Sequence, residues 1–87
     1  MRRLQVASVA AVCARDPRHN RARMVSTIET IVQEHPDVEL VLFGEMILGW
    51  YTPGASPEYD RQISEPVPGE TTRALAALTR QHGIYIC

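Results

Sequence analysis

Short apolar runs alternate with helical patterns along this chain, and that alternation constrains the fold more than any other feature. The apolar runs cover residues 4–12, 38–43 and 84–87. One amphipathic pattern, over residues 20–35, separates the first two runs, and a second, over residues 70–82, precedes the third. Strands that alternate with helices in this way are typical of a parallel sheet with right-handed crossovers. The sequence therefore predicts an α/β fold in the order β-α-β-loop-α-β.

Residues that start and stop helices mark the limits of the two helical patterns. Asp16-Pro17 signals a helix start, and Pro36 ends the first helix because the residue before a proline avoids the helical region. Pro68-Gly69 opens the second helix, and Gly83 is suited to close it in a left-handed conformation. The first helix carries an apolar stripe with the spacing of one buried face, formed by Met24, Ile28, Ile31 and Val32.

The middle apolar run differs sharply from the segment that follows it. Residues 38–43 are almost continuously apolar, which favours a strand with helices on both faces of its sheet. Residues 44–65 contain Thr52-Pro53-Gly54 and Ser56-Pro57, which indicate turns. We expect a long loop there, and a long loop within a compact domain is more often functional than not.

Length, charge and composition exclude several classes of protein. Eighty-seven residues with 45% hydrophobic and 22% charged side chains are typical of one small globular domain. A net charge of −1 gives no broad attraction for nucleic acid or for an anionic membrane. No run approaches the ~18 apolar residues of a membrane span, and the start of the chain alternates like a strand rather than a signal peptide. Because the third apolar run is cut short at Cys87, we expect residues 1–87 to be the amino-terminal part of a larger single domain.

The cysteines and arginines add two further expectations. Cys13 and Cys87 are too few for a disulfide framework and lack the spacing of a metal site, so we expect a reducing, cytoplasmic compartment and no metal. All nine basic residues are arginine, and six of them lie in the first 23 positions. Residues 15–23 are either a local anion-binding patch or a solvated helix start, and the second is the simpler interpretation.

Glu45 follows the middle apolar run and is the strongest candidate for a catalytic residue. A carboxylate at the carboxyl end of a parallel strand lies where α/β proteins place ligands and catalytic groups. We expect Glu45 to be partly buried beside Phe43, where desolvation makes a carboxylate a stronger general base. The alternative is a loop carboxylate that caps a turn or pairs with an arginine such as Arg61.

Four motifs follow one another in an order that is specific when they are taken together. The first is a strand, Leu4–Val9, that leads through Asp16 and Asn20 into a helix. The others are Val41-Leu42-Phe43-Gly44-Glu45 before Gly49-Trp50-Tyr51, then Glu65-Pro66-Val67-Pro68-Gly69, then the helix 72–82 before Gly83-Ile84-Tyr85-Ile86. Over almost the whole chain, this order resembles the amino-terminal part of the nitrilase, or carbon–nitrogen hydrolase, superfamily.

The resemblance implies an αββα sandwich that hydrolyses a non-peptide amide, carbamoyl or nitrile bond through a Glu-Lys-Cys triad. In that family the glutamate deprotonates the cysteine thiol, the thiolate attacks the substrate carbon, and the lysine stabilises the oxyanion. By position, Glu45 matches the family glutamate. Tyr51 lies near the family's loop aromatic, so Trp50 and Tyr51 are candidate substrate-binding residues, although they would equally suit a lid over the core. The resemblance also implies a small-molecule substrate, no cofactor, and a homo-oligomer in the full-length form.

The chain departs from the family pattern in three ways. Gly44 stands where proline is usual, Trp50 stands where glycine is common, and the chain contains no lysine. Cys87 has neither a lysine nor a nucleophile elbow beside it, so packing is the simpler role for it, as it is for Cys13. Two thirds of the triad are therefore missing. The alternative function is a non-catalytic α/β interaction module, or an inactive fragment.

Overall fold

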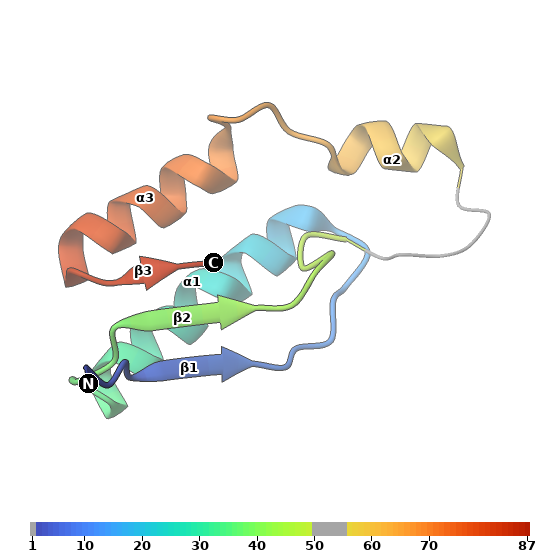
Figure 1. The fold of residues 1–87 in the computed structure, drawn as a ribbon. Helices are drawn as coiled ribbons and strands as arrows, with labels where there is room; N and C mark the ends of the chain where they lie inside the picture. The colour runs from blue at the N-terminus through green and yellow to red at the C-terminus, as the bar shows by residue number, and fades with distance from the viewer. Residues whose placement is uncertain (1, 50–55) are drawn as a thin grey trace.

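Three parallel strands form one sheet in the computed structural model of this protein, which describes residues 2–49 and 56–87 (Figure 1). The elements are β1 Val6–Val9, α1 Pro17–Glu34, β2 Leu40–Phe43, α2 Pro57–Ile63, α3 Glu70–His82 and β3 Tyr85–Ile86. The strand order is β1-β2-β3, with Val6 opposite Leu40 and Leu40 opposite Tyr85. The predicted α/β fold with parallel strands is confirmed.

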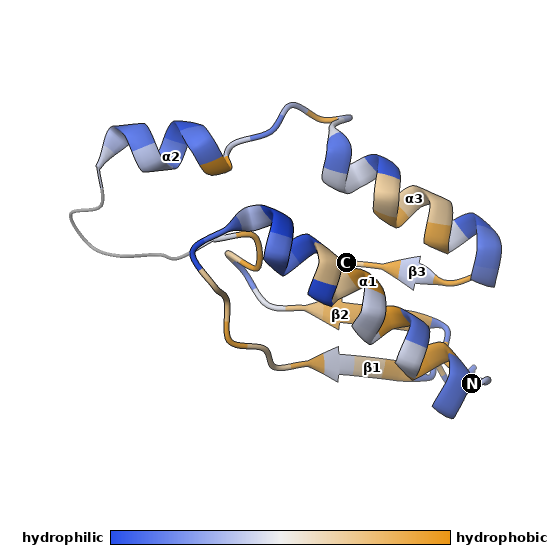
Figure 2. Cartoon of the chain, turned by 180° about the vertical axis from the view of Figure 1, so that it is seen from behind, coloured by the Kyte–Doolittle hydropathy of each residue, from blue (hydrophilic) through white to orange (hydrophobic). Residues whose placement is uncertain are grey.

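The core lies between one face of the sheet and the helices α1 and α3. Figure 1 shows α1 behind the strands, and Figure 2, from the opposite side, shows it in front of them. Ile28 of α1 and Val41 of β2 are both fully buried, and Leu78 of α3 joins the same cluster. The complete set of buried apolar residues in this cluster is Met24, Ile28, Val38, Val41, Phe43, Leu78 and Ile84. The predicted apolar stripe of α1 is therefore its core-facing side.

The opposite face of the sheet carries exposed apolar side chains. Leu42 is 37% exposed, Val6 is 47% exposed and Tyr85 is 74% exposed. The expectation that helices cover both faces of the sheet is therefore wrong for the described part of the chain. The reason is topological, because right-handed crossovers from β1 to β2 and from β2 to β3 place both helices on one side. A sheet with helices on a single face corresponds to one half of an αββα sandwich.

Capping residues fix the ends of the long helices. The Asp16 carboxylate accepts a 2.9 Å hydrogen bond from the Arg18 N–H, and Pro17 takes the first helical position. For this reason α1 begins at Pro17, as the Asp16-Pro17 signal predicts, and extends before the amphipathic pattern of residues 20–35. The bounds of α3 are those predicted, and Gly83 closes it at φ 65°, in the left-handed region that favours glycine. None of the described helices combines the length and the apolar character needed to cross a bilayer.

A short helix, α2, lies within the segment predicted as a loop, so that prediction is wrong for residues 57–63. The Ser56 hydroxyl accepts a 3.3 Å hydrogen bond from the Tyr59 N–H, and Pro57 occupies the first helical position. The Ser56-Pro57 pair indicates a turn, but it equally marks a helix start. The strands are also shorter than predicted, because β1 is paired with β2 only over Val6–Val9.

Candidate active site

Glu45 lies two residues after Phe43, the last residue of β2, and begins the Glu45 turn, which covers residues 45–49. It therefore lies at the carboxyl edge of the parallel sheet, as predicted. The expected burial beside Phe43 is wrong, because Glu45 is exposed while Phe43 points into the core. Within the described ranges Glu45 forms no ion pair with Arg61 or with another arginine. Its carboxylate is thus presented to solvent rather than held by a neighbouring cation.

Hydrogen bonds hold the backbone of the turn that carries Glu45. Met46 adopts φ 60°, and the Gly49 N–H donates a 3.3 Å hydrogen bond to the Met46 carbonyl. The Cys13 thiol lies 3.2 Å from the Ile47 carbonyl oxygen and 3.6 Å from that of Met46. The loop after β1 therefore contacts the turn after β2, and Cys13 packs there as a weak hydrogen-bond donor.

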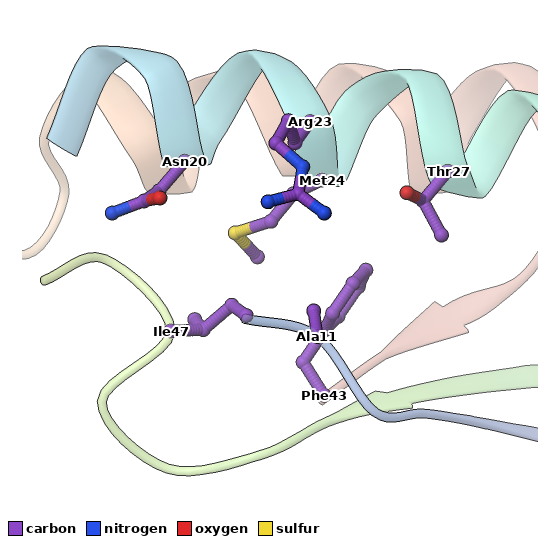
Figure 3. A pocket seen from close by; sticks show the side chains of 7 residues that line it. All are labelled: Ala11, Asn20, Arg23, Met24, Thr27, Phe43 and Ile47. Atoms are coloured by element: carbon purple, nitrogen blue, oxygen red, sulfur yellow. The ribbon is translucent and has the colours of Figure 1, made fainter. Parts of the chain in front are cut away.

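A small cavity lies beside this turn, between α1 and the ends of the first two strands (Figure 3). Its volume is about 20 Å³, and its lining residues are Ala11, Asn20, Arg23, Met24, Thr27, Phe43 and Ile47. A space of that size holds about one water molecule, so it is too small for an amide or nitrile substrate. The Arg23 guanidinium closes one side by donating a 2.7 Å hydrogen bond to the Val12 carbonyl.

Asn20 is a buried polar residue whose importance sequence reasoning missed. Only 3% of it is exposed, its Oδ1 accepts from the Ala14 N–H at 2.8 Å, and its Nδ2 donates to the Ala14 carbonyl at 2.8 Å. It thus ties the loop after β1 to the first turns of α1. In the sequence, only the family resemblance points to Asn20, because nothing local marks an asparagine in a helix as buried.

Cys87 lies beside β2, as the adjacency of parallel strands predicts. Its N–H donates to the Val41 carbonyl at 2.9 Å, and its carbonyl accepts from the Phe43 N–H at 2.8 Å. Its side chain is exposed, so the expectation that Cys87 is a buried packing residue is wrong. Trp50 and Tyr51 lie outside the described residues. The part of the chain that is described contains no group of three His, Cys, Asp or Glu side chains suited to a metal ion.

A carbon–nitrogen hydrolase family model matches residues 5–87, which include every strand and helix described above. The chain belongs to the carbon–nitrogen hydrolase family. Neither the comparison with curated proteins nor the comparison with solved structures gives a match. The family match confirms the predicted general class, hydrolases of carbon–nitrogen bonds, and agrees with a partial nitrilase-like fold.

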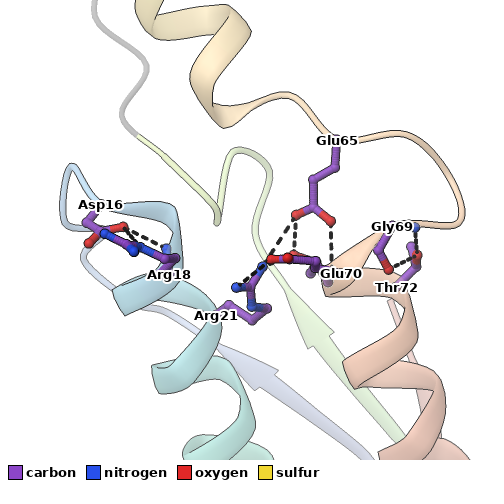
Figure 4. Close-up of polar contacts among 8 residues, drawn as sticks. Asp16, Arg18, Arg21, Glu65, Gly69, Glu70 and Thr72 are labelled. Carbon is purple, nitrogen blue, oxygen red and sulfur yellow. Dashed lines mark hydrogen bonds and ion pairs between the residues drawn. The ribbon is translucent and has the colours of Figure 1, made fainter.

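A polar cluster in this member of the carbon–nitrogen hydrolase family joins α1 to the start of α3 (Figure 4). The Glu65 carboxylate accepts hydrogen bonds from the Thr71 hydroxyl and, at 2.7 Å, from the Thr71 N–H. Arg21 of α1 lies 3.9 Å from Glu65 and 3.0 Å from Glu70. The Thr71 hydroxyl, then the Thr71 N–H, and then the Arg21 guanidinium hold the pKa of Glu65 below its ordinary value.

Gly69 allows the backbone to close around this Glu65 side chain. A Cβ atom at Gly69 would lie 2.4 Å from the Pro66 carbonyl oxygen and 2.8 Å from Glu65 Oε1. A side chain at that position would therefore displace the turn or the carboxylate. The sequence prediction that Gly69 serves the geometry of the helix start is confirmed, while the role of Glu65 as the partner of Thr71 was not predicted.

We expect Glu65→Gln to lower the free energy of unfolding at neutral pH by about 1–2 kcal/mol, because a charged acceptor is lost from the start of α3. The pKa of Glu65 is lower in the folded chain than its ordinary value of 4.5. Its stabilisation is therefore complete above that value and is lost as the pH falls through the folded pKa. Urea denaturation over a series of pH values should show the two proteins converging below pH 4.5.

Glu70→Gln is the matched control for this experiment. Glu70 also pairs with Arg21, but its side chain is 77% exposed, whereas that of Glu65 is 22% exposed. Exposed ion pairs contribute little, so the control should change stability by less than about 0.5 kcal/mol. A difference between wild type and Glu65→Gln that does not vary with pH would contradict the assignment.

Proposed function

We propose that this chain forms the amino-terminal part of a nitrilase-like hydrolase of non-peptide amide, carbamoyl or nitrile bonds, with Glu45 as the general base. The observation that carries the proposal is the position of Glu45. It is an exposed carboxylate on a turn at the carboxyl edge of a parallel sheet, in a chain that belongs to the carbon–nitrogen hydrolase family. That edge is where α/β proteins assemble their active sites.

In the proposed reaction the Glu45 carboxylate accepts the proton of a cysteine thiol, and the thiolate attacks the substrate carbon. A lysine ammonium stabilises the negative charge that develops on the substrate oxygen or nitrogen. With an amide or carbamoyl substrate, the proton held by Glu45 passes to the nitrogen that leaves as ammonia or amine, and water then releases the acid from the thioester. With a nitrile, the proton passes to the nitrogen of a thioimidate; one water then replaces this nitrogen, which leaves as ammonia, and a second water releases the acid. Residues 1–87 contain no lysine, so the cation of this triad lies outside them. Neither metal nor organic cofactor takes part in this scheme.

Trp50 and Tyr51 are proposed to line the substrate pocket. They follow Gly49, the residue that ends the Glu45 turn, so they lie within a few residues of the proposed base. Aromatic side chains in such a loop supply apolar contact area to a small substrate. We further propose a homo-oligomeric full-length enzyme, as the family resemblance implies, in the cytoplasm, as the low cysteine content indicates.

The test is expression of the complete open reading frame that encodes these residues, followed by assay of ammonia release from amides, carbamoyl compounds and nitriles. We expect turnover by the complete gene product and none above background by residues 1–87 alone. Turnover by the isolated 87 residues that is lost in Cys87→Ser would instead make Cys87 the nucleophile. A complete gene product that is folded but inactive on every class would contradict the proposed enzyme.

The second candidate function is a non-catalytic interaction module. One observation favours it, namely the exposed apolar face of the sheet that carries Val6, Leu42 and Tyr85. An open reading frame that stops after codon 87 would support this function over hydrolysis, because the chain would then lack the lysine of the triad.

A further inference from the structure

The backbone of the Glu45 turn lies directly against α2. Gly49, which ends this turn, is buried, and a Cβ atom there would lie 2.9 Å from Ile63 Cδ1 and 3.0 Å from the Tyr59 hydroxyl oxygen. Contacts below about 3.4 Å are tighter than most real Cβ contacts. Only glycine therefore lets the turn and α2 approach this closely without a shift of either side chain.

Tyr59 also binds the loop that precedes α1. It is 8% exposed, and its hydroxyl donates a 3.0 Å hydrogen bond to the Arg15 carbonyl. The Arg15 guanidinium carbon lies 5.2 Å from the centre of the Tyr59 ring, within the range of a cation–π contact. Tyr59 thus connects α2, the Glu45 turn and the loop between β1 and α1.

The loop between β1 and α1 also contacts the Glu45 turn directly, through Cys13. The Cys13 thiol donates to the Ile47 carbonyl at 3.2 Å, while Tyr59 and Ile63 lie against Gly49. The backbone of the turn is therefore contacted at Met46, Ile47 and Gly49, and the Glu45 side chain is left exposed at its start. A general base must lie within about 2.6–3.2 Å of the proton that it removes, so the position of this backbone matters for catalysis.

From these contacts we infer that Tyr59 is a positioning residue for Glu45: by packing on Gly49 and binding Arg15, it sets the place of the turn that presents the carboxylate. This inference rests on the proposed role of Glu45 as general base. Tyr59 itself does not touch the reacting atoms, and it acts through Gly49 and the turn.

The first measurement is structural and does not depend on catalysis. In the 87-residue chain we expect a nuclear Overhauser contact between the Ile63 methyl groups and the Gly49 Hα atoms. Tyr59→Ala should weaken this contact and shift the backbone amide resonances of Glu45 and Met46. Tyr85→Ala is the matched control, since Tyr85 is 74% exposed and lies on β3. Shifts confined to α2 in Tyr59→Ala would overturn the inference, whatever the complete gene product does.

The second measurement is kinetic and uses the complete gene product. Tyr59→Ala should lower kcat by about ten- to a hundredfold with KM changed less than about twofold, as a misplaced catalytic group does. Tyr59→Phe keeps the ring that the Arg15 guanidinium covers but removes the hydroxyl that lies against Gly49 and binds Arg15, so it should recover only part of kcat. Unchanged kcat in Tyr59→Ala would overturn the inference, while loss of activity in Glu45→Gln alone would leave the proposed function standing.

If Tyr59→Ala does not fold, a double-mutant cycle tests the coupling of Gly49 and Tyr59. Gly49→Ala places a methyl group against Ile63 and the Tyr59 hydroxyl, so we expect a roughly tenfold fall in kcat. Adding Tyr59→Phe removes that hydroxyl and should restore part of the loss. Effects of the two substitutions that multiply independently would show that Gly49 and Tyr59 are not coupled, and would overturn the inference.

Discussion

Glu45→Gln is expected to lower kcat of the complete gene product by roughly 10²- to 10⁴-fold, the contribution typical of a general base. A glutamine amide has nearly the same shape as the carboxylate but does not accept the thiol proton at neutral pH. The fold should be unaffected, because Glu45 is exposed and has no ion pair among the residues that the structure describes. The measurement is kcat with each active substrate, together with the unfolding midpoint.

Glu29→Gln is the control for this substitution. Glu29 is exposed on α1 and is likewise a glutamate on the surface of the chain. Glu29→Gln removes the same charge at a position remote from the carboxyl edge of the sheet. Because surface substitutions usually leave a protein little changed, kcat should stay within about twofold of wild type. Equal activity of Glu45→Gln and wild type would show that another group removes the thiol proton.

Asn20→Ala is expected to destabilise the protein by about 2–3 kcal/mol, because it leaves both backbone groups of Ala14 without their hydrogen-bond partner. Both bonds are 2.8 Å long and Asn20 is 3% exposed, so this side chain satisfies the two Ala14 backbone groups at a buried position. That loss is a large part of the stability of a small domain. Urea denaturation of both proteins under the same conditions measures it.

Gln33→Ala provides the matched control for Asn20→Ala. Gln33 also carries an amide on α1, but it is exposed near the carboxyl end of the helix. Its removal should change the free energy of unfolding by less than about 0.5 kcal/mol. If the two substitutions had the same effect, the Ala14 backbone groups would be solvated and Asn20 would not anchor the loop.

The bounds of α3 were predictable because the residues that determine them are adjacent in the sequence. Pro68-Gly69 precedes the helix and Gly83 follows it, and each acts on the backbone of its own turn. The helix α2 was not predicted, because the contacts that favour it join residues distant in the sequence. Ser56-Pro57 permits a turn or a helix, and the contact of Tyr59 with residues far away in the sequence favours the helix.

In the candidate site, too, features set by local sequence were predictable and features set by distant contacts were not. The position of Glu45 at the end of a parallel strand follows from the apolar run before it, and the structure agrees. The exposure of Glu45 does not follow from that run. Phe43 faces the core and Leu42 faces the open side of the sheet, and the chain turns immediately after them. The role of Glu65 was equally hidden, because its partners Thr71 and Arg21 meet only when α1 and α3 lie side by side.

The sequence by itself determined the order of strands and helices, the helix ends set by local caps, and the family to which the chain belongs. These features depend on side-chain periodicity and on backbone preferences that act over a few residues. Only the tertiary structure decided which face of the sheet is open, which polar side chains are buried, and what holds the Glu45 turn. Those features depend on contacts between residues that are distant in the sequence, such as Tyr59 with Arg15 and Gly49, whose energies no local pattern records.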